Sequence, residues 1–485
     1  MRGLLITLVV FGSLPFIFVE PILGLLMWAW LSYMTPYRLA WGFAHNVPFV
    51  FITALAALIS LVISKRRKWF PWTATTRVWV VFLVWLTISM MFAIYPHAAF
   101  VKWEEVMKIQ LMVLVTFLLI HERRHLDWVI WVAVISVGFY GIKGGIFTIL
   151  TGGHYHVWGP PGSWIGDNNE LGAAVLLVMP LMRYLQLHDS RRWMWWGLTG
   201  AMVLSAFTVL GTYSRGDFLG AAAMVGVFWW RSRRKVLMTL PLIAVAAGAV
   251  AFMPSQWVTR MYSTSDYQHD ASAQGRINAW HMAINMAEHR LTGGGFESVS
   301  KQTFERYAPE PNNVHAFHSI FFQILGDSGF IGLGLYLLLG FLTFRNCRWI
   351  LRNAKGRDDL LWARDLAAML QVGFTGFAAS AAFLSLSYYD LPYQLMACVV
   401  LLQQIVIREL SAEVSPAQVR SERFTWRPRW QVGRTRPAIG EFSARQSSVH
   451  ADSRLAAVGE PSGAATYNAN GAWRSGEART RRGSG

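Results

Sequence analysis

Long runs of residues without formal charge constrain the fold of this chain more than any other feature. Examples are Val78–Ala93, Gln110–Ile120, Ala173–Leu181 and Ile331–Phe344. The hydrocarbon core of a bilayer is about 30 Å thick, and an α-helix of about 20 apolar residues crosses it. The chain supplies about a dozen such segments, and only 15% of its residues are charged. The sequence therefore predicts an all-α, polytopic integral membrane protein rather than a set of soluble domains.

The basic residues predict which connectors share one side of the membrane. They cluster at Lys65–Lys68, Arg123–Arg124, Arg191–Arg192, Arg231–Lys235 and Arg345–Arg364. Connectors rich in Lys and Arg stay in the cytoplasm, so the remaining connectors are expected on the opposite face. Those remaining connectors are 35–47, 95–103, 151–167, 254–316 and 387–390. This distribution accounts for the net charge of +17, and nucleic acid is not an expected partner.

The expected membrane-spanning segments alternate between the two sets of connectors. They are predicted at 48–64, 78–94, 104–120, 127–150, 168–187, 193–211, 214–230, 236–253, 317–344, 364–386 and 391–409. Residues 1–34 are long for one span and short for two, and Pro15 and Pro21 interrupt them. We expect one broken span there, hence about twelve helices with both termini in the cytoplasm; two spans would give about thirteen. The apolar start resembles a signal peptide without a cleavage site, so it is interpreted as a retained anchor.

The segments group into four predicted regions. Residues 1–190 form an N-terminal transmembrane domain, 191–345 a core that includes the large outer loop 254–316, and 346–410 the C-terminal helices. Residues 411–485 are rich in Ser, Arg, Gly, Ala and Glu, so they are expected to be a disordered, basic cytoplasmic tail that touches anionic lipid. The two cysteines, Cys347 and Cys398, have no spacing that indicates a disulfide framework or a zinc site.

Two arginines are placed where an anion could bind on the outer side. Arg215 opens a predicted span, and spacing alone favours a side chain that reaches the interface and pairs with Asp217. The alternative is a guanidinium that grips a diphosphate. Arg276 lies near the start of a predicted amphipathic helix, 276–288, which is expected to lie on the membrane and to end at Gly293–Gly295. Free N–H groups in its first turn would also favour an anion.

A histidine pair precedes the apolar run that begins near residue 317. His315 and His318 lie at its start, and Ser319 and Gln323 share one face of the predicted helix. Such a histidine is more often a hydrogen-bonded interface residue. Imidazole is also the side chain best matched to taking a proton from a hydroxyl near neutral pH.

A polar stretch from Gly152 to Glu170 admits two interpretations. Asp167 and Glu170 can cap the helix that follows, or they can belong to a lip that binds sugar together with nearby aromatic residues. His154 and His156 lack a third ligand at a fixed spacing. Neither a metal site nor a cofactor is therefore expected.

Together these residues resemble the O-antigen ligase and polymerase superfamily. The resemblance covers about 200–345 and rests on four stretches of sequence. They are Ser214-Arg215-Gly216, Gly275-Arg276-x-x-x-Trp280, Glu288 to Phe296, and His318-Ser319-x-x-x-Gln323-x-Leu325-x-x-x-Gly329. The start of the chain, Met34-x-Pro36-x-Arg38-x-x-Trp41-Gly42, is similar to O-glycosylation ligases associated with exosortase A systems.

The resemblance implies an inverting, metal-independent glycosyltransferase in a bacterial inner membrane, with its active site facing the periplasm. The donor would be a glycan on undecaprenyl diphosphate, and the acceptor a hydroxyl of a protein or lipid. Arg215 and Arg276 match arginines that hold the diphosphate, and His318 matches the histidine that activates the acceptor. The family usually has Asn after this histidine, where this chain has Ser319.

Three other functions remain open from the sequence. A polysaccharide polymerase of the same superfamily would differ only in its acceptor. A flippase or transporter of lipid-linked glycans would be expected to show internal repeats, and no convincing repeat relates the two halves of the chain. A membrane scaffold would make the Arg and His pattern incidental.

Overall fold

The described part of the chain contains helices and no strands. The computed structural model describes residues 2–40, 42–64, 69–231, 248, 251–262 and 271–421. In chain order the helices are α1 (Arg2–Val19), α2 (Pro21–Met34), η1 (Pro36–Leu39), η2 (Phe43–His45), α3 (Phe49–Ile63), α4 (Ala74–Met91), α5 (Pro96–Leu119), α6 (Arg123–Leu150), α7 (Asn168–His188), α8 (Arg192–Gly211), α9 (Arg215–Arg231), α11 (Ser255–Tyr262), α12 (Ala271–His289), α13 (Lys301–Tyr307), α14 (Ile320–Asn353), α15 (Leu361–Ala381) and α16 (Asp390–Ser421). The all-helical prediction is confirmed for these residues.

Seven of the described helices are long and apolar enough to cross a membrane, by length and composition. They are α1, α4, α6, α7, α8, α14 and α16, and α2 and α3 are shorter apolar helices. Each span predicted outside 1–34 and 236–253 coincides with a helix. Most of 236–253 lies outside the described residues, so the number of spans stays a prediction.

The first helices differ from the expected single broken span. Pro15 lies inside α1, and the chain turns only at Glu20, before Pro21 opens α2. Ile6 and Val10 of α1 join one apolar cluster with Leu31 of α2, so the two helices run antiparallel. The sequence pointed to both prolines as breaks. Only Pro21 marks a break. It lies in the first turn of α2, where the missing N–H of proline needs no helical partner, and α1 ends before it.

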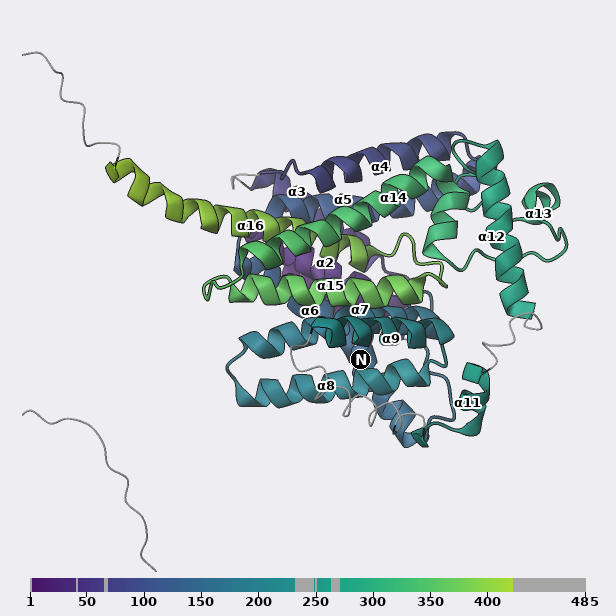
Figure 1. Ribbon diagram of the computed structural model, residues 1–485, viewed down its shortest axis with the longest axis horizontal. Coiled ribbons are helices and arrows are strands. Elements are labelled where there is room, and N and C mark those ends of the chain that lie inside the picture. Colours follow the sequence, from purple (N-terminus) through teal and green to yellow (C-terminus); the bar gives the residue numbers. More distant parts are fainter. Residues whose placement is uncertain are drawn as a thin grey trace, which may run out of the picture. The chain divides into compact units, whose positions relative to one another are not determined.

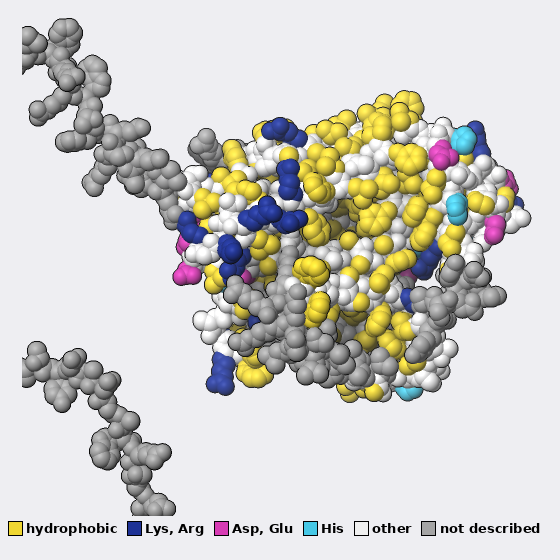
Figure 2. Space-filling model, in the orientation of Figure 1, with side chains coloured by type: hydrophobic (Ala, Val, Ile, Leu, Met, Phe, Trp, Pro, Cys, Tyr) yellow, Lys and Arg dark blue, Asp and Glu magenta, His cyan; other side chains and the backbone are white. Residues whose placement is uncertain are grey.

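The α7–α8 and α14–α15 connectors, both predicted to be cytoplasmic, lie at one end of the helices, and α12, from the predicted outer loop, lies at the other end (Figure 1). At one end Arg123 lies over the ring of Trp362, 4.7 Å from its centroid, and Arg408 lies over Trp69. Basic side chains gather mainly toward this end in Figure 2, and apolar side chains cover the middle. At the other end α12 crosses the helix ends, with α13 beside it.

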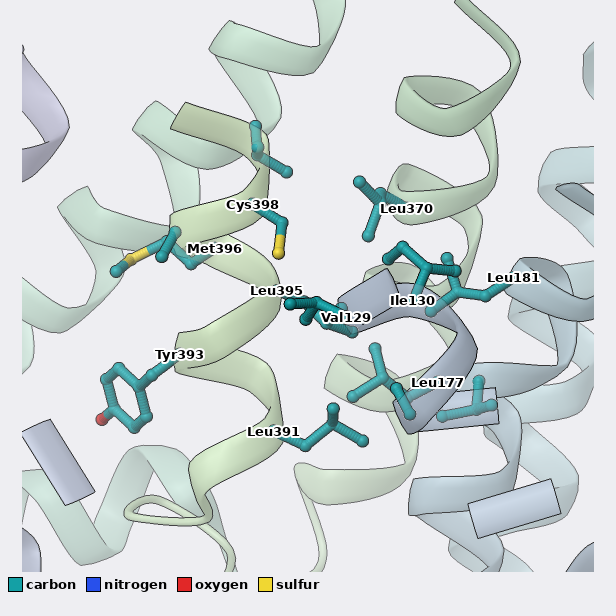
Figure 3. Close-up of a cluster of buried hydrophobic side chains, with 14 of the residues drawn as sticks. Val129, Ile130, Leu177, Leu181, Leu370, Leu391, Tyr393, Leu395, Met396 and Cys398 are labelled. Atoms are coloured by element: carbon teal, nitrogen blue, oxygen red, sulfur yellow. The ribbon is translucent and has the colours of Figure 1, made fainter. Parts of the chain in front are cut away.

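Helix α16 packs against α5, α14, α15 and α6, and leucines of α7 join the same buried cluster. Figure 3 shows part of this cluster, made by Val129, Ile130, Leu177, Leu181, Leu370, Leu391, Leu395 and Cys398. Cys347 and Cys398 are both free and buried. Helix α16 continues to Ser421, past the predicted start of the tail at 411, and residues 422–485 lie outside the described residues.

Helix α14 is broken at Gly329, whose φ of 67° and ψ of −172° are not helical. The break frees three backbone carbonyls from helical bonding, and each receives a partner from elsewhere in the chain. Gly294 N–H donates to the Gly326 carbonyl over 2.7 Å, and Gly295 N–H to the Asp327 carbonyl over 3.0 Å.

The third freed carbonyl, that of Ser328, accepts from the Trp85 indole N–H over 2.8 Å. The Ser89 hydroxyl lies 2.6 Å from the carbonyl oxygens of both Thr292 and Asp327. The predicted helix stop at Gly293–Gly295 therefore also serves as the surface on which the broken helix is docked.

Close helix contacts depend on glycines, as is common in membrane proteins. A Cβ at Gly373 of α15 would lie 2.5 Å from the Leu177 carbonyl oxygen of α7. Gly200 of α8 has open space around its would-be Cβ.

We expect Gly373→Ala to lower the thermal midpoint of the purified protein, because the added methyl meets backbone that cannot retreat. Overpacking of this kind costs about 1–3 kcal/mol. Gly200→Ala is the matched control, since it adds the same methyl to a helix without a contact. Equal midpoints for the two variants would contradict the role given to Gly373.

Candidate functional site

A cavity of about 730 Å³ lies at the end of the helices where α12 crosses them, and both predicted arginines line it. Arg215 enters from the first turn of α9 and Arg276 from α12, and both side chains are partly buried. The wall between them includes Asn169 of α7, Trp280 of α12 and Phe383 of the α15–α16 connector. The fold therefore brings two guanidinium groups from distant segments to one partly open cavity, where Coulomb interactions are stronger than in bulk water.

Asp217 does not face this cavity. Its side chain is fully buried, and its carboxylate accepts hydrogen bonds from the hydroxyls of Ser380 on α15 and Thr212. Gly172 of α7 leaves room for it, because a Cβ there would overlap the carboxylate. These contacts, rather than the predicted pairing with Arg215, hold Asp217 between α7, α9 and α15.

Helix α12 begins earlier than the sequence indicated. It starts at Ala271, so the amide of Arg276 lies inside the helix, and the expected help from first-turn N–H groups at this residue is wrong. Its most buried face packs on α13 and α14 through Ala279, Met282 and Met286. The helix therefore rests on protein along this face rather than lying with its apolar face on the membrane.

His318 does not line the cavity; it lies two residues before α14 begins, within electrostatic range of the cavity residue Arg276. Its backbone is left-handed, with φ of 41°, and its N–H donates to the Ser385 hydroxyl over 3.2 Å. The ring of His315 packs against α12, since a Cβ at Gly275 would lie 2.5 Å from its Nδ1. That Nδ1 is buried and has no hydrogen-bond partner among the described residues.

The surroundings of His318 lower its pKa from the ordinary value of 6.5. Burial is the largest cause, and the positive charge of Arg276 is the next. Asp167 acts in the opposite direction, and His315 adds to the lowering. The imidazole is therefore neutral at pH 7 and is able to accept a proton.

The other candidates at the start of α14 have structural contacts. Ser319 is buried at the N-cap position but forms no side-chain cap with the described first turn. Gln323 Oε1 accepts from the Ser387 hydroxyl over 2.7 Å, which ties α14 to the α15–α16 connector.

Asp167 and Glu170 form a capping box at the start of α7. Asp167 Oδ1 accepts from Asn169 N–H over 3.4 Å, and Asp167 N–H donates to Glu170 Oε2 over 3.3 Å. The capping interpretation is confirmed, and neither acid lines the cavity.

Sequence reasoning missed several residues of the site. Asn169 and Phe383 line the cavity, and Ser385 contacts the His318 backbone. The polar stretch before α7 could have pointed to Asn169. Little in the sequence could have pointed to Ser385 and Phe383, because they lie in a short connector between two apolar runs.

Two family models match separate parts of the chain. Residues 200–337 match the model described as O-Antigen ligase, and residues 1–190 match a family of unknown function. No curated protein matches the chain. The first match contains both arginines and His318. It supports the O-antigen ligase superfamily and indicates a membrane enzyme of the ligase or polymerase type that acts on lipid-linked glycans.

We expect Arg276→Gln to raise the pKa of His318, because it removes a nearby positive charge that opposes protonation. Only the neutral imidazole reacts with diethyl pyrocarbonate, so the pH dependence of His318 modification, located by mass spectrometry, reports this pKa. The wild-type midpoint should lie below 6.5. Arg306→Gln, an exposed charge on α13, should leave it in place. An unmoved midpoint in Arg276→Gln would show that the guanidinium does not act on His318.

Proposed function

We propose that the chain transfers a glycan from a polyprenyl diphosphate carrier, undecaprenyl diphosphate in bacteria, to a hydroxyl acceptor on the periplasmic face of the inner membrane. The observation that carries this proposal is the cavity shared by Arg215 and Arg276, with the partly buried His318 within electrostatic range of Arg276. A planar guanidinium matches the oxygens of a phosphate with two parallel hydrogen bonds.

Each group has a role in the transfer. The acceptor oxygen attacks the anomeric carbon, and the bond from that carbon to the diphosphate oxygen breaks. His318 takes the proton of the acceptor hydroxyl, and the electron pair leaves with the diphosphate. Attack opposite the leaving group inverts the anomeric configuration. Arg215 and Arg276 stabilise the negative charge that develops on the diphosphate, the part that a divalent metal plays in many other transferases.

The remaining candidates support these groups. Asp167 lies within electrostatic range of His318 and favours its protonated form as the proton arrives. Asp217 fixes α9, the helix that carries Arg215. Gln323 fixes α14, the helix that follows His318. Ser319 stands where related chains usually have Asn, so the orientation of His318 rests on other contacts.

The acceptor decides between a ligase and a polymerase. A ligase adds the glycan to a protein or lipid hydroxyl, whereas a polymerase adds it to another glycan on the same carrier. We favour the ligase, on the sequence resemblance to O-glycosylation ligases, and the assay below includes both kinds of acceptor.

We expect Arg215→Ala and Arg276→Ala each to lower kcat by about 10²–10³, as for loss of one group that stabilises an oxyanion. His318→Ala should cost about 10²–10⁴, the usual contribution of a general base. The measurement is glycan transfer by protein in nanodiscs, supplied with a polyprenyl-diphosphate glycan and either acceptor. Arg306→Ala is the control for loss of a basic side chain in the same polar segment. Full transfer by the three folded variants would remove them from the site, and carrier movement across vesicles without product would indicate a transporter.

We expect Lys301→Cys on α13 to react with an impermeant maleimide only from outside the cytoplasm. Lys355→Cys, in the connector between α14 and α15, should react only from the cytoplasmic side. Both positions are exposed, and the native Cys347 and Cys398 are buried, so background labelling should be low. The reverse pattern in oriented vesicles would place the cavity on the wrong face for a periplasmic reaction.

A further inference from the structure

One peptide group, that between Phe317 and His318, is held at both of its polar atoms. Its carbonyl accepts from the indole Nε1–H of Trp280 over 2.8 Å. Its N–H donates to the hydroxyl of Ser385 over 3.2 Å. Since the carbonyl and the amide belong to one rigid plane, turning that plane breaks both hydrogen bonds.

The backbone that these bonds hold is one that His318 does not adopt readily. A φ of 41° is uncommon for a side chain with a Cβ, and such conformations persist when the surrounding structure fixes them. The direction of the imidazole follows from this φ, because the Cβ is attached to the same Cα.

Trp280 is itself well fixed. Its ring stacks on Phe322 of α14 with a centroid distance of 4.8 Å and an interplanar angle of 7°. It lies one helical turn after Arg276 on α12 and lines the same cavity. A single rigid side chain therefore connects the helix that carries Arg276 to the turn that carries His318.

We propose that Trp280 and Ser385 are positioning residues that aim the His318 imidazole at the acceptor hydroxyl beside the arginine cavity. This inference rests on the proposed function and adds residues from α12 and the α15–α16 connector to it. Neither residue takes or gives a proton in the transfer. Their effect reaches the reaction through the backbone of His318, so it should appear in kcat rather than in donor binding.

Two substitutions remove the two hydrogen bonds singly. Trp280→Phe keeps an aromatic ring against Phe322 and removes the N–H donor. Ser385→Ala removes the acceptor, and Ser385→Thr restores a hydroxyl. Trp85→Phe is the matched control, since the Trp85 indole also donates to a backbone carbonyl over 2.8 Å, but at the α14 break and not at the His318 turn.

Trp280→Phe and Ser385→Ala should each lower kcat by about tenfold or more while the donor KM changes by less than about twofold. Ser385→Thr should recover most of the activity. Trp85→Phe should lower thermal stability to a similar degree and keep kcat within about twofold of wild type. Unchanged kcat in Trp280→Phe, or an equal loss of kcat in Trp85→Phe, would overturn the positioning role.

A second measurement separates this inference from the proposed function. The rate of His318 modification by diethyl pyrocarbonate at fixed pH should change in Trp280→Phe and Ser385→Ala but not in Trp85→Phe. If the wild type transfers no glycan, the proposed function fails while this rate still tests the turn. If the wild type is active and the rates of all variants agree, the positioning role fails alone.

Discussion

The need to satisfy backbone polar groups at the break in α14 fixes the frame of the candidate site. In a membrane an unpaired backbone carbonyl has no water to bond to. The carbonyls of Gly326, Asp327 and Ser328 are freed by the break, and they are satisfied by Gly294, Gly295 and residues of α4. The bonds from Trp85 and Ser89 hold the break against α4. The bonds from the Gly294 and Gly295 N–H groups tie the segment after α12 to α14. Because α12 carries Arg276 and α14 follows His318, these two glycine bonds set both groups in one rigid arrangement.

The positions of the helices could be predicted from the sequence, but their breaks and some of their ends could not. Runs of apolar residues mark α4, α6 and α14 because burial in a bilayer demands them. The break at Gly329 was not predicted, although the stretch Gly326-Asp327-Ser328-Gly329 interrupts the apolar run at this point. The start of α12 was placed late because Ser272 and Gln274 interrupt the apolar period, although polar residues are tolerated where a helix faces water.

The arginines and the histidine of the candidate site could be predicted from the sequence, but most of the other residues that line the cavity could not. Arg215 and His318 stand at borders between polar and apolar sequence that the alternation of spans places at the same end of the helices, and Arg276 lies in the loop 254–316 at that end. Asp217 was misread as a partner of Arg215. Residues two positions apart on a helix point to different faces, so Asp217 turns into the helix bundle while Arg215 reaches the cavity. Wall residues such as Phe383 depend on tertiary packing of a short connector, which no local pattern records.

The charges around His318 also give an order to the proposed reaction. Burial and the Arg276 guanidinium oppose protonation of the imidazole and lower its pKa. A diphosphate held between the arginines would bring negative charge close to Arg276 and offset its effect on His318. The imidazole would then become a stronger base when the donor is present. In the proposed reaction, the arrangement that stabilises the leaving group would therefore also couple proton removal from the acceptor to occupation of the donor cavity.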